Sequence, residues 1–284
     1  MKYKSISTFL SIATFTLLIP LAACGTDNGT PRQQPTWFNL TEQQMCSVVT
    51  NPNLDEVLVQ YEGFTVSFNP TMHMPNWVAW TITADKIENA DIPRSGTFNP
   101  DPNVPGCATL ADYYQSGFDR GHMAPAADMK WNAKAMDNSF FLTNICPQSN
   151  DLNTGAWKNL EEKCRKNAMR DSLLVVVCGP VLTQGFQQYI GETPLPVPPS
   201  FFKVILTPAG MAGPQAIGFI MNNGYVQGGM QPAATTVDEV EQLTGHDFFH
   251  LLPDDIENAL EADKDFNRFS TGKLSKRSLI INKQ

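Results

Sequence analysis

Polar side chains that suit phosphate chemistry gather in one segment, residues 118–170. They are Asp119-Arg120-Gly121-His122, then Asn144, then Asn153, and finally Glu161 and Arg165. A histidine supplies a base that titrates near neutrality. An asparagine supplies a hard oxygen ligand for Mg²⁺ or Ca²⁺, and Arg120 supplies a fixed cation for a phosphate or carboxylate. The segment therefore offers a base, a metal ligand and an anion contact.

Three local elements must hold these side chains. The pattern predicts one strand that ends in Arg-Gly-His and a second strand, Phe140 to Ile145, that ends near Asn144. It predicts a helix that begins near Asn153 and runs through Trp157 to Arg170, a stretch without glycine or proline. Glu161 and Arg165 are one helical turn apart, so they share a face of that helix.

The remaining elements predict an α+β domain. Runs rich in β-branched and aromatic residues predict strands at Val57 to Tyr61, Phe64 to Phe68, Trp77 to Ile82, Leu173 to Cys178, Phe201 to Leu206 and Ala216 to Met221. Helices are predicted at Val237 to Leu243 and Asp254 to Glu261, the latter opened by Pro253. Because the strands are interrupted by helices without regular βαβ alternation, we expect a mainly antiparallel central sheet flanked by helices. No break in composition divides residues 36–284, which predicts one domain.

The ordered motifs resemble those of the DNA/RNA non-specific endonucleases of the ββα-metal (His-Me finger) superfamily, which include endonuclease G-like, sugar-non-specific nucleases. Asp119-Arg120-Gly121-His122 is similar to the family's Asp-Arg-Gly-His motif, and Asn-x-x-Pro-Gln followed by Asn-x-x-x-Trp is similar to its second block. Asn76-Trp77-Val78-Ala79 resembles an early family strand, and Glu241-x-x-Thr244-Gly245 resembles its C-terminal portion. The resemblance implies a ββα-metal active-site motif within the α+β domain.

The same resemblance implies a mechanism. His122 would be the general base that activates the attacking water, and Asn153 would be the one direct protein ligand of a Mg²⁺, for which Mn²⁺ could substitute. Glu161 would bind the metal through water, and Asn144 would orient His122 or a metal-bound water. The contacts to phosphate would come from Arg120, Arg165 and Arg94. The implied activity is sequence-independent endonucleolytic hydrolysis of DNA and RNA to 5′-phosphate products, by a homodimer.

A histidine base with an ordinary pKa also predicts a pH profile. Because the base must be neutral, activity should fall below the pKa of His122, and a flat profile from about pH 5 to 8 would contradict the role.

Competing interpretations use the same residues. Cys146 and His122 could form a thiol hydrolase, which would survive chelation and be inactivated by alkylation. A degenerate family member would bind nucleic acid without cleaving it, although the retained His122, Asn153 and Glu161 argue against this. Glu161 and Arg165 could form an exposed ion pair. Asp119 is assigned no catalytic role, and Trp157 is assigned to the core instead of a base-stacking platform.

The N-terminus has the features of an export signal. Lys2 and Lys4 precede an apolar stretch that ends in Leu21-Ala22-Ala23-Cys24-Gly25, which resembles the lipobox of bacterial lipoproteins. We therefore expect residues 1–23 to be a signal peptide, Cys24 to be acylated, and residues 24–35 to be a polar tether. This implies export and a lipid anchor in the bacterial cell envelope, at the outer membrane.

Cysteine usage and charge add two further expectations. Export favours disulfides among Cys46, Cys107, Cys146, Cys164 and Cys178, with at least one thiol left over. The net charge of −8 argues against a nucleic-acid partner at first sight. However, residues 238–265 hold ten acidic residues against one lysine, so the rest of the chain is near neutral. The predicted catalytic helix is locally basic, with a balance of +3 over residues 156–170.

Overall fold

The computed structural model describes residues 39–94 and 96–273, which lie in one compact unit of the chain. The proposed signal peptide, the tether and the acylation site Cys24 lie outside the described residues. No helix within the described ranges is long and apolar enough to cross a membrane.

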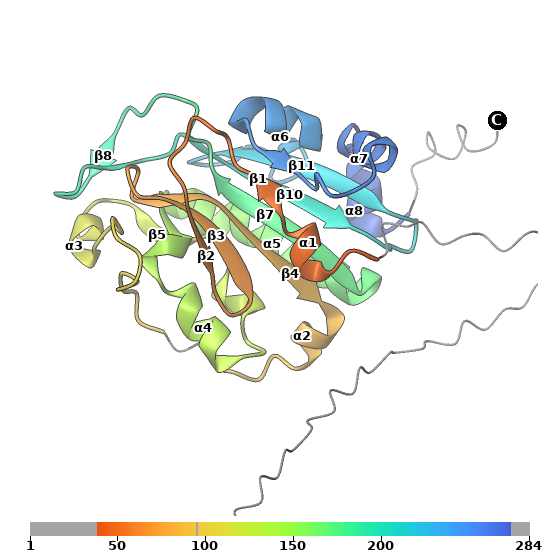
Figure 1. Cartoon of the computed structure of the whole chain (residues 1–284), viewed down its shortest axis with the longest axis horizontal. Coiled ribbons are helices and arrows are strands. Elements are labelled where there is room, and N and C mark those ends of the chain that lie inside the picture. Colours follow the sequence, from red (N-terminus) through yellow and green to blue (C-terminus); the bar gives the residue numbers. More distant parts are fainter. Residues whose placement is uncertain (1–38, 95, 274–284) are drawn as a thin grey trace, which may run out of the picture. The chain divides into compact units, whose positions relative to one another are not determined.

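A seven-stranded antiparallel sheet forms the centre of the unit, with the strand order β12-β11-β10-β7-β4-β3-β2 (Figure 1). Its strands are β2 (Val57–Gln60), β3 (Phe64–Asn69), β4 (Met74–Thr83), β7 (Leu173–Pro180), β10 (Ser200–Thr207), β11 (Gln215–Asn222) and β12 (Ala234–Thr235). Short pairs join β1 (Val48–Val49) to β13 (Asp247–Phe248), and β8 (Tyr189–Ile190) to β9 (Leu195–Pro196). The expected mainly antiparallel sheet is therefore confirmed.

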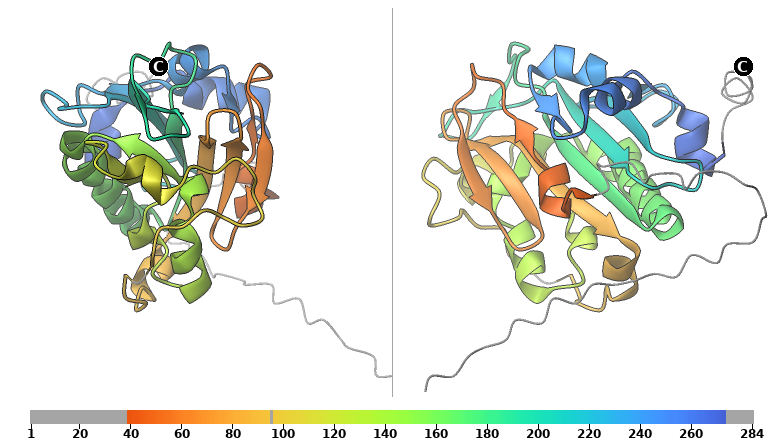
Figure 2. Two further views of the ribbon diagram at one scale, coloured as in Figure 1. Left: turned by 90° about the vertical axis from the view of Figure 1, so that its left-hand side faces the viewer. Right: turned by 45° about the vertical axis from the view of Figure 1, so that its right-hand side comes forward.

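Helices cover both faces of this sheet (Figures 1 and 2). They are α1 (Glu42–Met45), α2 (Ala84–Glu88), α3 (Leu110–Tyr113), α4 (Ala133–Ser139), α5 (Trp157–Asp171), α6 (Val237–Thr244), α7 (Asp254–Glu261) and α8 (Phe266–Thr271). Side chains of successive strand residues point to opposite faces. In β10, Phe201 and Ile205 therefore pack with α5, whereas Phe202 and Val204 pack with α6 and α7.

The predicted active-site segment folds as a hairpin followed by a helix. Strand β5 (Asp119–His122) pairs antiparallel with β6 (Ile145–Gln148), and His122 lies opposite Ile145. One turn of π-helix, Leu152–Ala156, then leads into α5. Gly121 must be glycine, because a Cβ there would lie 2.1 Å from the Gln148 side-chain oxygen across the hairpin. This is the ββα arrangement that the resemblance implied.

One predicted strand is wrong. Phe140 to Ile145 is mostly not extended: Leu142–Asn144 forms a 3₁₀ turn, and strand β6 begins only at Ile145. Asn144 thus precedes β6 instead of ending a strand. The apolar run had suggested a strand, but its side chains fill the core in a compact turn, where Leu142 is fully buried.

The expected disulfides are also absent from the part of the chain that the structure describes. Cys46, Cys107, Cys146, Cys164 and Cys178 are all free thiols. Every one except Cys107 is buried, and Cys146, Cys164 and Cys178 pack into the core on the α5 face of the sheet. These cysteines act as small apolar side chains.

Candidate active site

His122, at the end of β5, packs against two phenylalanine rings that also contact each other. Its ring centroid lies 5.2 Å from that of Phe98 and 5.1 Å from that of Phe140. Its Nε2 atom is buried and has no hydrogen-bond partner among the described residues. Burial, aided by the nearby Arg94 cation, lowers the pKa of His122 to about 3. The imidazole is therefore neutral at physiological pH and keeps a lone pair available to accept a proton.

The two predicted phosphate contacts Arg94 and Arg120 stack on the same rings. The Arg120 guanidinium lies 4.7 Å from the centre of the Phe98 ring, and that of Arg94 lies 5.3 Å from the centre of the Phe140 ring. Both arginines are exposed. Phe98 and Phe140 thus position the base and two cations together, a role that the sequence motifs did not reveal.

Asn144 holds the backbone that follows His122. Its side-chain oxygen accepts from the Ala124 N–H, and its Nδ2 donates to the carbonyls of Ala124 and Ser139, each at 2.9 Å. The residue is fully buried, and both donors of its amide are used. Asn144 therefore fixes the backbone that follows His122.

Asp119 orients Asn153 across 34 residues of sequence. The Nδ2 atom of Asn153 donates to Asp119 Oδ2 at 2.9 Å, and Asn150 donates to the same oxygen at 3.0 Å. The amide nitrogen of Asn153 is engaged, whereas its Oδ1 has no hydrogen-bond partner among the described residues. The π-helical turn that carries Asn153 contains Gly155 with non-helical backbone angles (φ −101°, ψ −114°). Asp119, for which the motifs indicated no role, is thus a positioning residue.

Arg165 pairs with Asp128 and not with Glu161. Its Nη1 atom lies 2.7 Å from Asp128 Oδ1, and the indole N–H of Trp80 donates to Asp128 Oδ2 at 3.0 Å. The Asp128 side chain is 1% exposed and that of Arg165 is 21% exposed. The interpretation of Glu161 and Arg165 as an exposed ion pair is therefore wrong, because the buried carboxylate of Asp128 takes the guanidinium.

We expect Arg165→Met to lower the free energy of unfolding by about 3–5 kcal/mol, because it leaves the Asp128 carboxylate buried without its partner. Urea denaturation measures this loss. Lys166→Met is the matched control on the same helix, and since Lys166 is exposed it should change stability by less than about 0.5 kcal/mol. Equal effects of the two substitutions would show that the buried pair contributes nothing.

Glu161 lies within range of several charges but has no bonded partner. Its carboxylate forms no hydrogen bond or ion pair with any residue that the structure describes. The pKa of Glu161 is raised to about 7, mainly by burial and in smaller part by Asp128, against the opposing charges of Lys203, Arg165 and Arg94. The carboxylate therefore titrates near neutrality.

Lys203 is a buried cation beneath this helix. It is fully buried on β10, and its Nζ lies 4.1 Å from the centre of the Trp157 ring and 5.5 Å from that of Trp80. Its Nζ has no hydrogen-bond partner among the described residues. The signal in the sequence was a lone lysine inside the apolar run Phe201 to Leu206, which by itself indicated only a strand.

These shifts change the expected pH profile. Because its pKa is lowered, His122 stays neutral from pH 5 to 8. Activity that does not change with pH over this range would therefore not contradict the role of His122 as a base. We expect activity to fall at low pH because of Glu161, whose ionised form is lost as the pH falls through about 7. Measurement of kcat/KM from about pH 5 to 9 should show this fall in the wild type and not in Glu161→Gln. If activity fell equally at low pH in both proteins, the fall would come from a group other than Glu161.

Cys146 is not a nucleophile. It is fully buried, and burial raises the pKa of its thiol well above the usual range. A thiolate is the reactive form, so the thiol-hydrolase interpretation fails.

Three of the predicted site residues, Arg94, Arg120 and Asn153, line one cleft of about 440 Å³. Its walls include Arg94, Phe98, Tyr113, Tyr114, Gln115, Phe118, Asp119, Arg120 and Asn153. His122 adjoins it through Phe98. Glu161, Arg165 and Asn144 do not line it, so the metal contact predicted for Glu161 and the phosphate contact predicted for Arg165 stay predictions.

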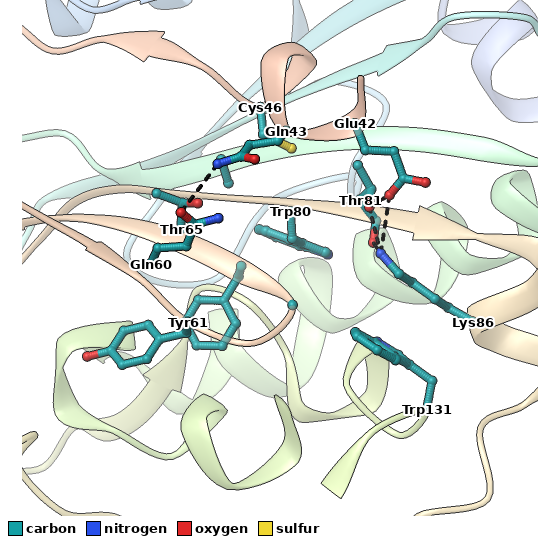
Figure 3. Close-up of a pocket in the computed structure, with 13 residues that line it drawn as sticks. Glu42, Gln43, Cys46, Gln60, Tyr61, Thr65, Trp80, Thr81, Lys86 and Trp131 are labelled. Carbon is teal, nitrogen blue, oxygen red and sulfur yellow. Dashed lines mark hydrogen bonds and ion pairs between the residues drawn. The ribbon is translucent and has the colours of Figure 1, made fainter. Parts of the chain in front are cut away.

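A different cavity, of about 230 Å³, lies between α1, the β2–β3 hairpin and Trp131 (Figure 3). There Lys86 contacts Thr81 and Glu42 and lies 5.1 Å from the centre of the Trp131 ring. This cavity contains none of the predicted site residues.

A cluster of acidic side chains lies elsewhere: the carboxylates of Asp238, Glu241 and Glu261 have oxygens within 4.8 Å of one another. This cluster lies on α6 and α7 and does not line the cleft, so part of the acidic excess lies away from the site.

The fold and this cleft define a ββα nuclease-like protein, and comparison with known proteins agrees. The sequence model of the DNA/RNA non-specific endonuclease family matches residues 41–255. The chain therefore belongs to the DNA/RNA non-specific endonuclease family.

Individual relatives support the assignment. The human mitochondrial nuclease EXOG is 35% identical over 234 residues, which cover 74% of this chain and 63% of the human protein. A nuclease from Nostoc sp. (strain PCC 7120) is 30% identical over 223 residues, covering 74% of this chain and 80% of its own. A chain in a crystal structure of the EndoG/EndoGI complex superposes with a TM-score of 0.66 and 25% identity, covering 70% of this chain and 88% of that one.

Proposed function

We propose that this protein is a metal-dependent, sequence-independent endonuclease that hydrolyses phosphodiester bonds in DNA and RNA and leaves 5′-phosphate ends. The observation that carries the proposal is that Asn153 and two exposed arginines line one cleft, and that the neutral His122 packs against Phe98 in the wall of that cleft. Nothing in this set reads a base edge, which fits cleavage without sequence preference.

The residues of the chain supply base and anion-binding chemistry. His122 accepts the proton of the attacking water at Nε2, which has no competing partner among the described residues. Arg94 and Arg120 bind the scissile phosphate, and they are already oriented by the Phe140 and Phe98 rings. A bound phosphate anion also offsets the Arg94 charge that helps to lower the pKa of His122, so substrate strengthens the base.

The donor set at Asn153 and Glu161 fits a magnesium ion. Asn153 offers one oriented amide oxygen, and Glu161 offers a carboxylate that no described residue engages. Mg²⁺ keeps most of its waters and uses few protein ligands, so one direct ligand and one water-mediated ligand suffice. When bound, the ion polarises the phosphate and stabilises charge on the leaving oxygen.

The first test is cleavage with and without a metal. Residues 25–284 are incubated with closed circular plasmid and with single-stranded RNA, in Mg²⁺, in Mn²⁺ and in excess EDTA. We expect nicking and then degradation of the plasmid, and degradation of the RNA, in either metal and none in EDTA. Cleavage that persists in EDTA would overturn the metal requirement, whereas tight binding without cleavage would make the chain a degenerate family member.

We propose further that the protein is exported, anchored in the outer membrane through an acylated Cys24, and dimeric. The sequence at Leu21 to Gly25 supports the anchor, and the family resemblance supports the dimer. Membrane fractionation of the full chain against Cys24→Ala tests the anchor, since the variant should leave the membrane fraction. Light scattering on residues 25–284 tests the dimer.

A further inference from the structure

An exposed aromatic side chain stands at the wall of the candidate cleft. Tyr114 is 76% exposed and lines the same cavity as Arg94, Arg120 and Asn153. Its ring stacks on no ring or cation in the part of the chain that the structure describes, and its hydroxyl only accepts from Gln115 Nε2 at 3.4 Å. Trp157, four residues after Asn153, is 1% exposed and cannot stack on a ligand.

The backbone that carries Tyr114 is held firmly although the side chain is exposed. Its N–H donates to the carbonyl of Ala111 at 3.1 Å, and the Ser116 hydroxyl donates to the carbonyl of Tyr113 at 3.0 Å. The helix before it, α3, is tied to a distant loop, because the Asp112 carboxylate accepts from the N–H of Thr193 at 3.0 Å and from its hydroxyl at 2.8 Å. A tyrosine has only two side-chain torsions to order, so a fixed backbone leaves it prepared for a flat ligand.

The turn after Tyr114 uses unusual backbone conformations. Gln115 has φ +50°, although it is not a glycine, and Gly117 has φ +82°. At Gln115 this conformation persists only where the surrounding structure enforces it, whereas Gly117 adopts a positive φ without strain. The turn leads directly into β5, which carries Asp119 and Arg120, so four residues separate Tyr114 from the start of that strand.

The geometry points to a base-stacking role for Tyr114: we propose that it stacks on an unpaired base next to the scissile phosphate and so makes the site prefer single-stranded nucleic acid. The inference rests on the proposed nuclease function. A base in a duplex is already stacked and paired on both sides, so it offers no free face unless it is unpaired first. Stacking on an aromatic ring tolerates every base, which agrees with a site that has no sequence preference.

Charge in the cleft supports this occupant. Arg94 and Arg120 face it, whereas Oδ2 of Asp119, the acidic residue in its lining, is occupied by Asn150 and Asn153. The cleft volume of about 440 Å³ falls within the range of small-ligand sites. A nucleotide, with an anionic phosphate and a flat base, matches two cations beside an open ring.

The test compares Tyr114→Ala, Tyr114→Phe and wild type on a labelled single strand and on the same sequence as a duplex. We expect Tyr114→Ala to raise KM for the single strand by about 5- to 150-fold, the equivalent of one lost base stack, with kcat and duplex cleavage unchanged. Tyr114→Phe keeps the ring and should behave as wild type. Tyr225→Ala is the matched control, because Tyr225 is 73% exposed and does not line the cleft.

A binding measurement separates this inference from the nuclease proposal. Fluorescence anisotropy of a labelled single strand in EDTA reports affinity without cleavage, and Tyr114→Ala should weaken it by a similar factor. If wild type cleaves neither substrate, the nuclease proposal fails while anisotropy still decides the role of Tyr114. Unchanged single-strand affinity and KM in Tyr114→Ala, or an equal loss on the duplex, would overturn the stacking role.

Discussion

Replacing His122 with alanine should lower turnover by about 10²–10⁴-fold while the protein remains folded, because the substitution removes the proposed general base, which packs against Phe98 in the cleft wall. The magnitude is large since Nε2 of His122 is the buried lone pair that no described residue engages. Plasmid nicking at saturating Mg²⁺ measures the loss, and circular dichroism with urea denaturation verifies the fold.

His250 provides the control for this substitution. Its ring bonds the Ser47 hydroxyl at 3.0 Å and lies outside the cleft, so His250→Ala should leave turnover unchanged. Turnover of His122→Ala near the wild-type value would remove His122 from the mechanism. If His122→Ala lost activity because it unfolded, the result would show only that the Phe98 and Phe140 rings need the His122 ring as a packing partner.

The second large effect is expected at Asn153. Asn153→Ala removes the proposed direct metal ligand, so we expect a loss of at least about 10²-fold in activity and a higher requirement for Mg²⁺. Asp119→Asn leaves the ligand but removes the carboxylate that holds its Nδ2, and should cost about 10–100-fold. A titration of activity against Mg²⁺ measures both effects, because each variant should shift its midpoint upward and Asn153→Ala should shift it further.

Asn150 offers a matched control for this series. It donates to the same Asp119 oxygen as Asn153, but it is exposed and does not line the cleft. Asn150→Ala should therefore retain nearly full activity and the wild-type midpoint. If all three variants behaved alike, the effect would belong to the loop and Asn153 would not be a ligand.

Patterns within one element predicted most of the fold. The stretch from Trp157 without glycine or proline predicted α5 to within a residue of its observed end at Asp171, and the apolar runs predicted the central strands. The exception, Phe140 to Ile145, shows where such patterns fail. The side chains of a short apolar run can fill a core equally well from a strand or from a turn. Only the elements packed around the run in the folded protein decide which of the two forms.

The types and order of the active-site residues could also be recognised from the sequence alone. Asp119-Arg120-Gly121-His122 and the later Asn153 and Glu161 indicated a base, an anion contact and a metal ligand, since these depend on side-chain chemistry. The need for glycine within the first motif, by contrast, became clear only from the Gln148 side chain on the paired strand.

The partners of those residues are long-range, and only the tertiary structure decided them. Asp119 reaches Asn153 across 34 residues, and Asp128 reaches Arg165 across 37. Sequence spacing identifies side chains three or four residues apart on one face of a helix, and it therefore suggested Glu161 as the partner of Arg165. In the structure Arg165 instead bonds the carboxylate of Asp128, which is 1% exposed and also accepts from the indole N–H of Trp80. Burial likewise lowered the pKa of His122 and raised that of Glu161, which no sequence pattern could indicate.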